Sequence, residues 1–218
     1  MIDIEKITAS LKDGEQKDEQ LRYMVKPCIK ISREEYDKLL LAVGNRYLQV
    51  VGRPADFIIP DYAGIFYEWM VNDDYKGISL TGPVGCGKTT MLRAFYNTYN
   101  IILKNYKIGT AWLNYAQPKI ITGKELARQV VKEETMPLMD KACIFLDDIG
   151  REGGVVNNFG TIRYPLTEWM LERDYFAVPV FTTLNTDFKA LADIYGIAAV
   201  DRLISWTSIV TVTGKSKR

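Results

Sequence analysis

Hydrophobic positions along the chain follow two periods, which predicts strands that alternate with helices. Short β-type runs, each bounded by polar or glycine residues, occur at 77–81, 142–146 and 178–183. Between them the apolar residues recur at helical spacing, as in the run from Met91 to Phe95. This alternation predicts an α/β fold of three layers, with helices on both faces of a central parallel sheet.

Helical patterns also precede the first of these strands. Ser32 and Glu35 are spaced as a capping box, which predicts the start of a helix. The apolar stripe of this helix is expected to contain Tyr36, Leu39, Leu40, Val43 and Tyr47. A second amphipathic helix is expected after Pro60, with inward side chains at Tyr62, Ile65, Phe66, Trp69 and Met70. We therefore divide the chain into an N-terminal arm (1–31), a helical extension and linker (32–76) and a core (77–218).

The second half of the core continues the same alternation. Strands are expected at 110–115 and 119–122, and a helix is expected at 124–133. The glycine- and asparagine-rich segment 151–160 could be a mobile element or a flexible connector. A helix at 161–173 is expected to follow, although Pro165 can move its start toward Tyr164. The residues of this helix expected to face the sheet are Ile162, Leu166, Trp169 and Met170.

The turn between the strand at 77–81 and the following helix carries the clearest chemistry. It fits the phosphate-binding pattern G-x-x-x-x-G-K-[ST] in full. Backbone N–H groups of such a turn point at phosphate oxygens, and the helix N-terminus favours anions. Lys88 would reach the β- and γ-phosphates, and the Thr89 hydroxyl would bind Mg²⁺. The residues expected to bind a nucleoside triphosphate are Gly82, Pro83, Val84, Gly85, Cys86, Gly87, Lys88, Thr89 and Thr90.

Two carboxylates follow the apolar run at 142–146, which is predicted to be a buried central strand. Asp147 would hold Mg²⁺ through its water shell, and Asp148 would orient or polarise an attacking water. The pair could instead cap the turn before Gly150, since aspartate favours turns. A complete phosphate-binding turn upstream favours the catalytic interpretation.

Five motifs together resemble the DnaC/IstB-like branch of AAA+ ATPases: GPVGCGKTT, CIFLDDIG, VFTTLNTD, YGIAAVDRLI and VTGKSKR. The resemblance covers about residues 52–218, and the branch includes bacterial and phage helicase loaders and the ATPase helpers of some transposons. It implies an AAA+ type P-loop fold with little or no C-terminal lid, in which the strand at 178–183 lies between the other two. It also implies ATP and Mg²⁺ as cofactors, an ATP-dependent homo-oligomer, and a replicative helicase or a transposase as partner. The arm at 1–31 would dock this partner, or would be a solvated tail or a helix lying on the core.

The resemblance assigns further roles. Asn185 resembles the sensor residue at the γ-phosphate, with Thr183 as the second choice. Arg202 resembles the arginine that reaches into a neighbouring subunit's site, although an ion pair within the chain, to Asp201 or Asp193, is the alternative. Phe57 and Ile58 would lie near the adenine, or would simply pack in the core.

Two departures from the family pattern lower the expected activity. Asp148 stands where many members have glutamate, so we expect slow hydrolysis of ATP. Ala198 stands where the family often has arginine, which leaves Arg202 as the finger candidate. The resulting hypothesis is a slow ATPase of DNA replication, a helicase loader on single-stranded DNA. The alternatives are a transposition helper and a nucleotide-gated binding module with negligible hydrolysis. A small-molecule kinase is disfavoured, because it would need an acceptor pocket and an arginine-rich lid and the sequence shows neither.

Composition narrows the possible functions further. The chain has 218 residues, a net charge of +1 and no histidine, which excludes imidazole catalysis and His-ligated zinc. Cys28, Cys86 and Cys143 have no metal-binding spacing. The sequence shows neither a signal peptide nor an apolar run long enough for a membrane span, so we expect a cytoplasmic protein. Contact with single-stranded DNA would need a local patch, although a solvated helix face with ordinary core aromatics is the favoured interpretation of the same residues. The candidates are Trp112, Tyr115, Lys119, Lys124, Arg128 and Lys132.

Overall fold

The structure is a computed structural model that describes residues 29–72, 76–105, 118–132, 143–158, 160–172 and 179–214. Residues 1–28 of the predicted N-terminal arm therefore lie outside the described residues, as do the predicted strand at 110–115 and the basic C-terminal residues 215–218. Ile29 is buried, and its backbone N–H donates to the Met70 carbonyl at 3.1 Å.

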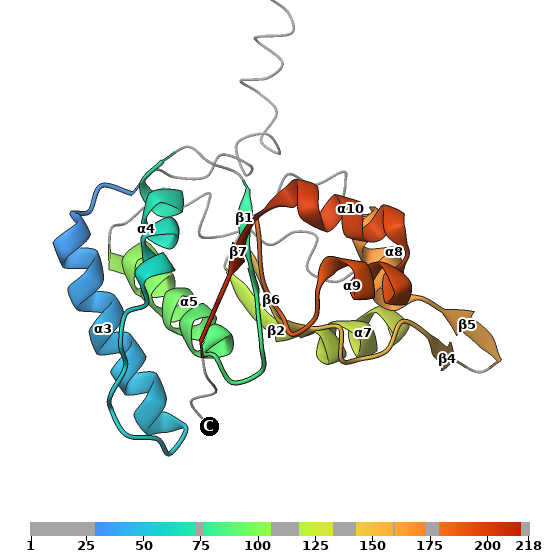
Figure 1. The fold of residues 1–218 in the computed structure, drawn as a ribbon, viewed down its shortest axis with the longest axis horizontal. Helices are drawn as coiled ribbons and strands as arrows, with labels where there is room; N and C mark the ends of the chain where they lie inside the picture. The colour runs from blue at the N-terminus through green and yellow to red at the C-terminus, as the bar shows by residue number, and fades with distance from the viewer. Residues whose placement is uncertain are drawn as a thin grey trace, which may run out of the picture.

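A parallel sheet forms the centre of the described chain (Figure 1). Its strands, in spatial order, are β2 (Lys119–Thr122), β3 (Ile144–Ile149), β6 (Val180–Leu184), β1 (Gly77–Thr81) and β7 (Thr207–Thr211). β6 lies between β3 and β1 and pairs in parallel with both. The strand order implied by the resemblance is confirmed. The C-terminal ends of β1, β6 and β3, which carry the predicted site, therefore lie side by side at the same end of the sheet.

Helices cover both faces of this sheet and complete three layers (Figure 1). One face carries α3 (Arg33–Val50), α4 (Gly64–Val71) and α5 (Lys88–Asn105), with the short η1 (Asp61–Ala63) before α4. The other face carries α7 (Gly123–Lys132), α8 (Pro165–Glu172), α9 (Phe188–Tyr195) and α10 (Ile197–Trp206). Among the described residues, no helix combines the length and apolar character needed to cross a bilayer. The predicted three-layer α/β fold with a central parallel sheet is confirmed.

Aromatic rings fill the core between the sheet and α4 and α5. Phe181 of β6 stacks on Phe145 of β3, with ring centroids 4.6 Å apart and an interplanar angle of 12°. Trp69 of α4 meets Phe181 edge-on at 4.6 Å, and Phe95 of α5 lies 5.4 Å away. All four rings are buried. The sheet strands that carry the site therefore share one tightly packed support.

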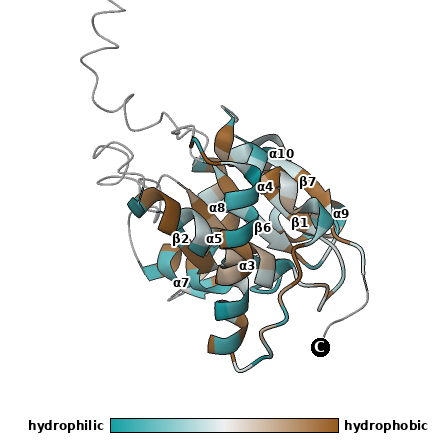
Figure 2. Cartoon of the chain, turned by 90° about the vertical axis from the view of Figure 1, so that its left-hand side faces the viewer, coloured by the Kyte–Doolittle hydropathy of each residue, from teal (hydrophilic) through white to brown (hydrophobic). Residues whose placement is uncertain are grey.

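The capping box that opens α3 is confirmed, but its buried face differs in part from the predicted stripe. The Glu35 N–H donates to Ser32 Oγ at 3.2 Å, and the Ser32 N–H donates to Glu35 Oε2 at 2.9 Å. Seen from its own side, α3 carries hydrophilic and hydrophobic residues along its length (Figure 2). The buried residues of α3 are Tyr36, Leu40, Gly44 and Leu48. A Cβ at Gly44 would lie 2.3 Å from the Phe57 ring, so glycine at this position lets the linker pack onto the helix.

The predicted helix at 161–173 is wrong at its start. Thr161–Arg163 forms β5, which pairs antiparallel with β4 (Val156–Asn158), and α8 begins at Pro165. Ile162, predicted to face the sheet, is 61% exposed on β5. Proline fits the first helical position, and the Glu168 carboxylate accepts the Tyr164 N–H at 2.9 Å, so the helix starts there. Residues 156–158 of the segment predicted as a mobile element or connector therefore form one strand of a short hairpin.

Candidate nucleotide-binding site

The phosphate-binding turn joins β1 to α5 in a conformation that requires glycine. Gly87 has a φ of +98°, a backbone region that side chains rarely adopt. A Cβ at Gly82 would lie 2.2 Å from the backbone oxygen of Val212, just beyond β7. Glycine at these positions therefore allows the turn to pass close to the backbone beyond β7 and to lead into α5.

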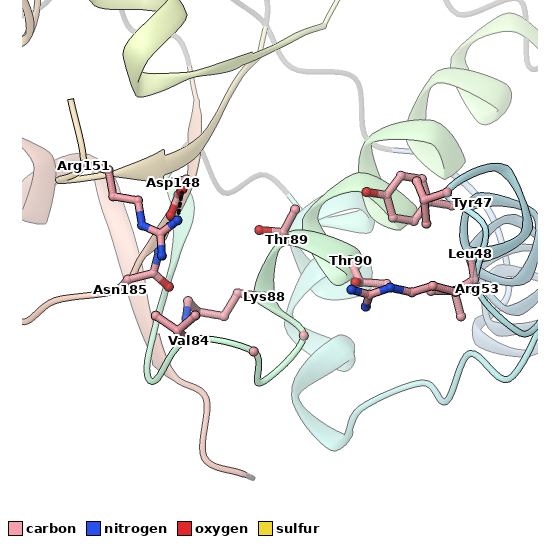
Figure 3. A pocket seen from close by; sticks show the side chains of 13 residues that line it. Tyr47, Leu48, Arg53, Val84, Lys88, Thr89, Thr90, Asp148, Arg151 and Asn185 are labelled. Carbon is pink, nitrogen blue, oxygen red and sulfur yellow. Dashed lines mark hydrogen bonds and ion pairs between the residues drawn. The ribbon is translucent and has the colours of Figure 1, made fainter. Parts of the chain in front are cut away.

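A cavity of about 270 Å³, the phosphate cavity, lies beside this turn. Figure 3 shows Asp148, Arg151 and Asn185 on one side of it, Tyr47, Leu48 and Arg53 on the other, and Lys88 and Thr89 between them. A second cavity of about 470 Å³ adjoins the first at Gly85, Gly87 and Thr90. Its lining is more apolar and includes Leu48, Phe57, Ile58, Tyr62 and Met91. A polar cavity joined to an apolar one suits a ligand with phosphates at one end and a flat ring at the other.

Lys88 is buried at the start of α5, with 4% of its surface exposed. Its Nζ donates to the carbonyl oxygens of Gly82 at 2.6 Å and Pro83 at 2.8 Å. Cys86 Sγ lies 3.7 Å from the same nitrogen. The ammonium is thus held against the floor of the phosphate-binding turn, with its charge directly beneath the polar cavity.

Asp147 is the centre of a hydrogen-bond network that joins three elements. Its Oδ1 accepts from Thr89 Oγ1 of α5 at 2.9 Å and from Thr183 Oγ1 of β6 at 2.8 Å. Its Oδ2 is 3.2 Å from both Nε and a terminal nitrogen of Arg93. Thr89 lines the cavity and Asp147 is buried directly behind it, so two oxygen atoms lie next to each other there, and hard oxygen ligands are those that Mg²⁺ prefers. These residues fit the predicted magnesium site.

Asp148 owes its position to an irregularity in β3. Successive strand side chains point to opposite faces, so Asp147 and Asp148 could not both face the site from a regular strand. The register between β3 and β6 shifts between Leu146 and Ile149, and Asp148 has a φ of +62°, the one positive value among described residues other than glycine. The Asp148 N–H donates to Thr183 Oγ1 at 2.8 Å. This bulge lets Asp148 line the cavity while Asp147 contacts Thr89.

Both oxygens of the Asp148 carboxylate have partners. Asn185 Nδ2 donates to Oδ1, and a terminal nitrogen of Arg151 lies 3.0 Å from Oδ2 (Figure 3). The sensor candidate Asn185 therefore contacts the predicted catalytic carboxylate. Thr183, the second choice for that role, links Asp147 to the backbone of Asp148 instead.

The segment after Asp148 is anchored by Glu152. The Tyr195 hydroxyl of α9 donates to Glu152 Oε1 and accepts the Gly150 N–H at 3.0 Å, while the Arg151 N–H donates to Glu152 Oε2 at 3.1 Å. Burial raises the pKa of the Glu152 carboxyl above its usual range, although backbone hydrogen bonds partly oppose this. The backbone that carries Arg151 is consequently fixed to the helical layer.

The structure brings together most, but not all, of the predicted site residues. Phe57 is buried and Ile58 is 71% exposed, and both line the apolar cavity. Arg202 lies half-buried on α10 and does not line the phosphate cavity. Lys119, Lys124, Arg128 and Lys132 are exposed on β2 and α7, whereas Trp112 and Tyr115 lie outside the described residues. Contact with single-stranded DNA there stays a prediction.

Sequence reasoning missed several residues of the site. Arg93 follows Thr89 by one helical turn, and this spacing could have indicated that both side chains face the same partner. Tyr47, Leu48, Arg53 and Arg151 carried no comparable signal, because their places depend on how α3 and the segment after β3 fold against the cavity.

Replacing Thr183 by valine is expected to lower ATP turnover about tenfold, because a single hydroxyl links Asp147 to the backbone that sets Asp148. Valine keeps the shape of the buried side chain, whereas a Thr183→Ser control keeps the hydroxyl and should retain most of the turnover. Phosphate release measures the effect. Equal rates for Thr183→Val and wild type would show that this hydroxyl does not position the aspartates.

The phosphate-binding turn between β1 and α5 and the aspartates at the end of β3 give the chain the arrangement of a P-loop fold. No protein-family model and no curated protein matches the sequence significantly. Among solved structures, the DnaI structure aligns with a TM-score of 0.53 at 22% identity, over 75% of this chain and 89% of DnaI. The DnaC helicase loader aligns with a TM-score of 0.53 at 15% identity, over 72% of this chain and 94% of DnaC. AMPPCP-bound DnaA from Aquifex aeolicus aligns with a TM-score of 0.51 at 15% identity, over 72% of this chain and 48% of DnaA. The resemblance to DnaC-like proteins is thereby confirmed for the fold.

Proposed function

We propose that this chain is a slow, Mg²⁺-dependent ATPase that acts in DNA replication as a loader of a replicative helicase. The observation that carries the ATPase assignment is the Thr89–Asp147 hydrogen bond of 2.9 Å, which joins the phosphate-binding helix to the aspartate strand. Asp148 and Asn185 line the same cavity as Lys88. These are the groups that phosphoryl transfer to water needs in one place.

Each residue has a defined task in this proposal. Backbone N–H groups of the turn and the Lys88 ammonium bind the phosphates, and Thr89 with Asp147 holds Mg²⁺. The metal ion, when bound, would neutralise charge on the phosphate oxygens. Asp148 accepts a hydrogen bond from the attacking water, and Asn185 holds the Asp148 carboxylate in place. Leu48, Phe57 and Ile58 supply apolar surface for the adenine.

The replication role is supported by the proteins that share the fold. DnaC is described as a helicase loader, and a further DnaA structure, with a TM-score of 0.52 at 17% identity, is bound to AMPPCP and single-stranded DNA. In this proposal the chain assembles with copies of itself around ATP, in the cytoplasm. The helicase partner docks through the arm at 1–31, and single-stranded DNA contacts the exposed basic residues of β2 and α7.

The proposed function is tested most directly by asking whether two subunits share one ATP site. Arg202 resembles the arginine that acts across subunits and does not line the phosphate cavity of its own chain, and in this proposal it completes the cavity of a neighbour. Wild-type turnover should rise with protein concentration. Arg202→Ala should lower turnover by about 10³-fold or more, the effect typical of an arginine supplied in trans, while ATP binding persists. Lys189→Ala, which removes an exposed cation from α9, is the matched control.

Mixing two inactive variants extends this test. An Arg202→Ala subunit keeps its own Lys88, and a Lys88→Ala subunit keeps the Arg202 that it offers to its neighbour. The mixture should therefore recover part of the turnover that each variant lacks alone. Wild-type turnover in Arg202→Ala at assembling concentrations, or no recovery in the mixture, would contradict the shared site.

The partner is tested by capture with AMPPCP present. Purified replicative helicase should be retained by the wild type and lost on Lys88→Ala. Retention of a purified transposase instead would favour the transposition helper, which the same ATP site would serve.

A nucleotide-gated binding module is the second candidate. It is favoured by the engagement of both Asp148 oxygens, one by Asn185 and the other by Arg151. A carboxylate held on both oxygens is a poor acceptor for a water proton. Lys88-dependent capture of the partner without phosphate release would support this candidate over the ATPase.

A further inference from the structure

Arg151 occupies a place in the phosphate cavity to which neither the sequence motifs nor the proposed function gives a role. It lies three residues after Asp148, and its guanidinium lies 3.0 Å from Asp148 Oδ2. It lines the same cavity as Lys88 and Thr89 (Figure 3). Its side chain is 52% exposed, so its charge remains accessible from the cavity.

We propose that Arg151 is a γ-phosphate-binding residue that exchanges partners: it pairs with Asp148 before ATP binds and with the γ-phosphate afterwards. This inference rests on the proposed ATPase site and assigns it a regulatory step. When the Arg151 guanidinium moves away from Asp148, Oδ2 of that carboxylate becomes free to accept a proton from water. Asn185 continues to hold Oδ1, so the carboxylate stays oriented while it becomes available.

The local structure suits an exchange that involves the side chain alone. The Arg151 backbone is held by the Glu152 carboxylate, which is itself bound by Tyr195. The long Arg151 side chain can therefore turn without moving the backbone that follows Asp148. A terminal phosphate offers more negative charge and more acceptor oxygens than one carboxylate, and guanidinium groups bind phosphate in a bidentate manner.

The exchange explains how one chain can distinguish ATP from ADP. ADP lacks the γ-phosphate, so Arg151 would stay on Asp148 and keep that carboxylate engaged. ATP would draw Arg151 away and release it. The cation that recognises the triphosphate thus also keeps the Asp148 carboxylate engaged when no γ-phosphate is present.

Binding of AMPPCP and ADP to the full chain, measured by calorimetry with Mg²⁺, tests the proposal without hydrolysis. Arg151→Gln is expected to weaken AMPPCP binding about tenfold or more, the loss typical of one charge-assisted hydrogen bond, and to leave ADP binding within about twofold. ADP binding also reports that the variant is folded. Arg53→Gln removes a cation from the opposite side of the same cavity and should not change the ratio of the two affinities selectively.

The partner exchange itself is tested by a double-mutant cycle with Asp148→Asn. Removing the carboxylate charge should strengthen AMPPCP binding several-fold when Arg151 is present, because Arg151 no longer has to leave an anion. The same substitution should give little gain in the Arg151→Gln background.

Two results would overturn the inference. One is an unchanged ratio of AMPPCP to ADP affinity in Arg151→Gln. The other is an equal gain from Asp148→Asn in both backgrounds, which would show simple relief of charge repulsion. Either result leaves Lys88-dependent turnover of the wild type intact, so failure of this inference is distinguishable from failure of the proposed function.

Discussion

Replacing Lys88 by alanine is expected to lower phosphate release from ATP about 10²-fold or more. Removing one pre-organised group that stabilises developing charge typically costs this much. Lys88 is 4% exposed and already fixed by the carbonyls of Gly82 and Pro83, so little reorganisation is needed before it meets a phosphate. Phosphate release at saturating ATP, together with AMPPCP binding, measures the effect.

The control for this experiment has to separate lost chemistry from lost folding. Lys88→Ala also removes the cation that satisfies two carbonyl oxygens, so its thermal unfolding should be recorded beside its turnover. Lys189→Ala removes a positive charge from the surface and should keep wild-type turnover. Turnover in a folded Lys88→Ala protein equal to that of the wild type would show that the measured hydrolysis does not come from this site.

The sequence predicts the parts of the site that depend on local pattern. The strand at 77–81, the turn after it and the start of α5 all follow from glycine positions and helical spacing, and the structure confirms these elements. The strand order was implied by the resemblance rather than by periodicity, and it is confirmed as well. Local signals and family motifs agree here because the phosphate-binding turn is itself a local structure.

The sequence does not predict features that depend on distant packing. The bulge at Asp148 arises from the register between β3 and β6, which no pattern within either strand encodes. Its consequence is large, since it turns a second carboxylate toward the cavity and places Arg151 against it.

The hairpin formed by β4 and β5 shows that helical spacing can also predict a helix where none forms. Apolar Ile162 fits the helical spacing of Leu166 and Trp169, so periodicity extends the predicted helix too far toward the N-terminus. A turn at Gly160, with a φ of +87°, pairs the two short strands instead. Pro165 then marks the true start of α8.

Truncating Phe181 to alanine is expected to lower the free energy of unfolding by about 3–5 kcal/mol, a large part of the 5–15 kcal/mol of a typical domain. The ring is fully buried, stacks on Phe145 at 4.6 Å and meets Trp69 edge-on at 4.6 Å. It belongs to β6, which lies between the strand that leads into the phosphate-binding turn and the strand that carries both aspartates. A cavity here would therefore loosen the support that all three site strands share.

Urea unfolding of the full chain measures this loss, and Phe181→Leu is the matched variant because it keeps most of the apolar volume. Its loss should be clearly smaller than that of Phe181→Ala. AMPPCP should raise the unfolding midpoint of each variant that still binds it, since a ligand that binds only the folded state stabilises that state. Equal losses for leucine and alanine, or a loss below about 1 kcal/mol for alanine, would contradict a core closely packed around this ring. In that case the geometry of the candidate nucleotide site would depend on the backbone pairing of β6 rather than on the packing beneath it.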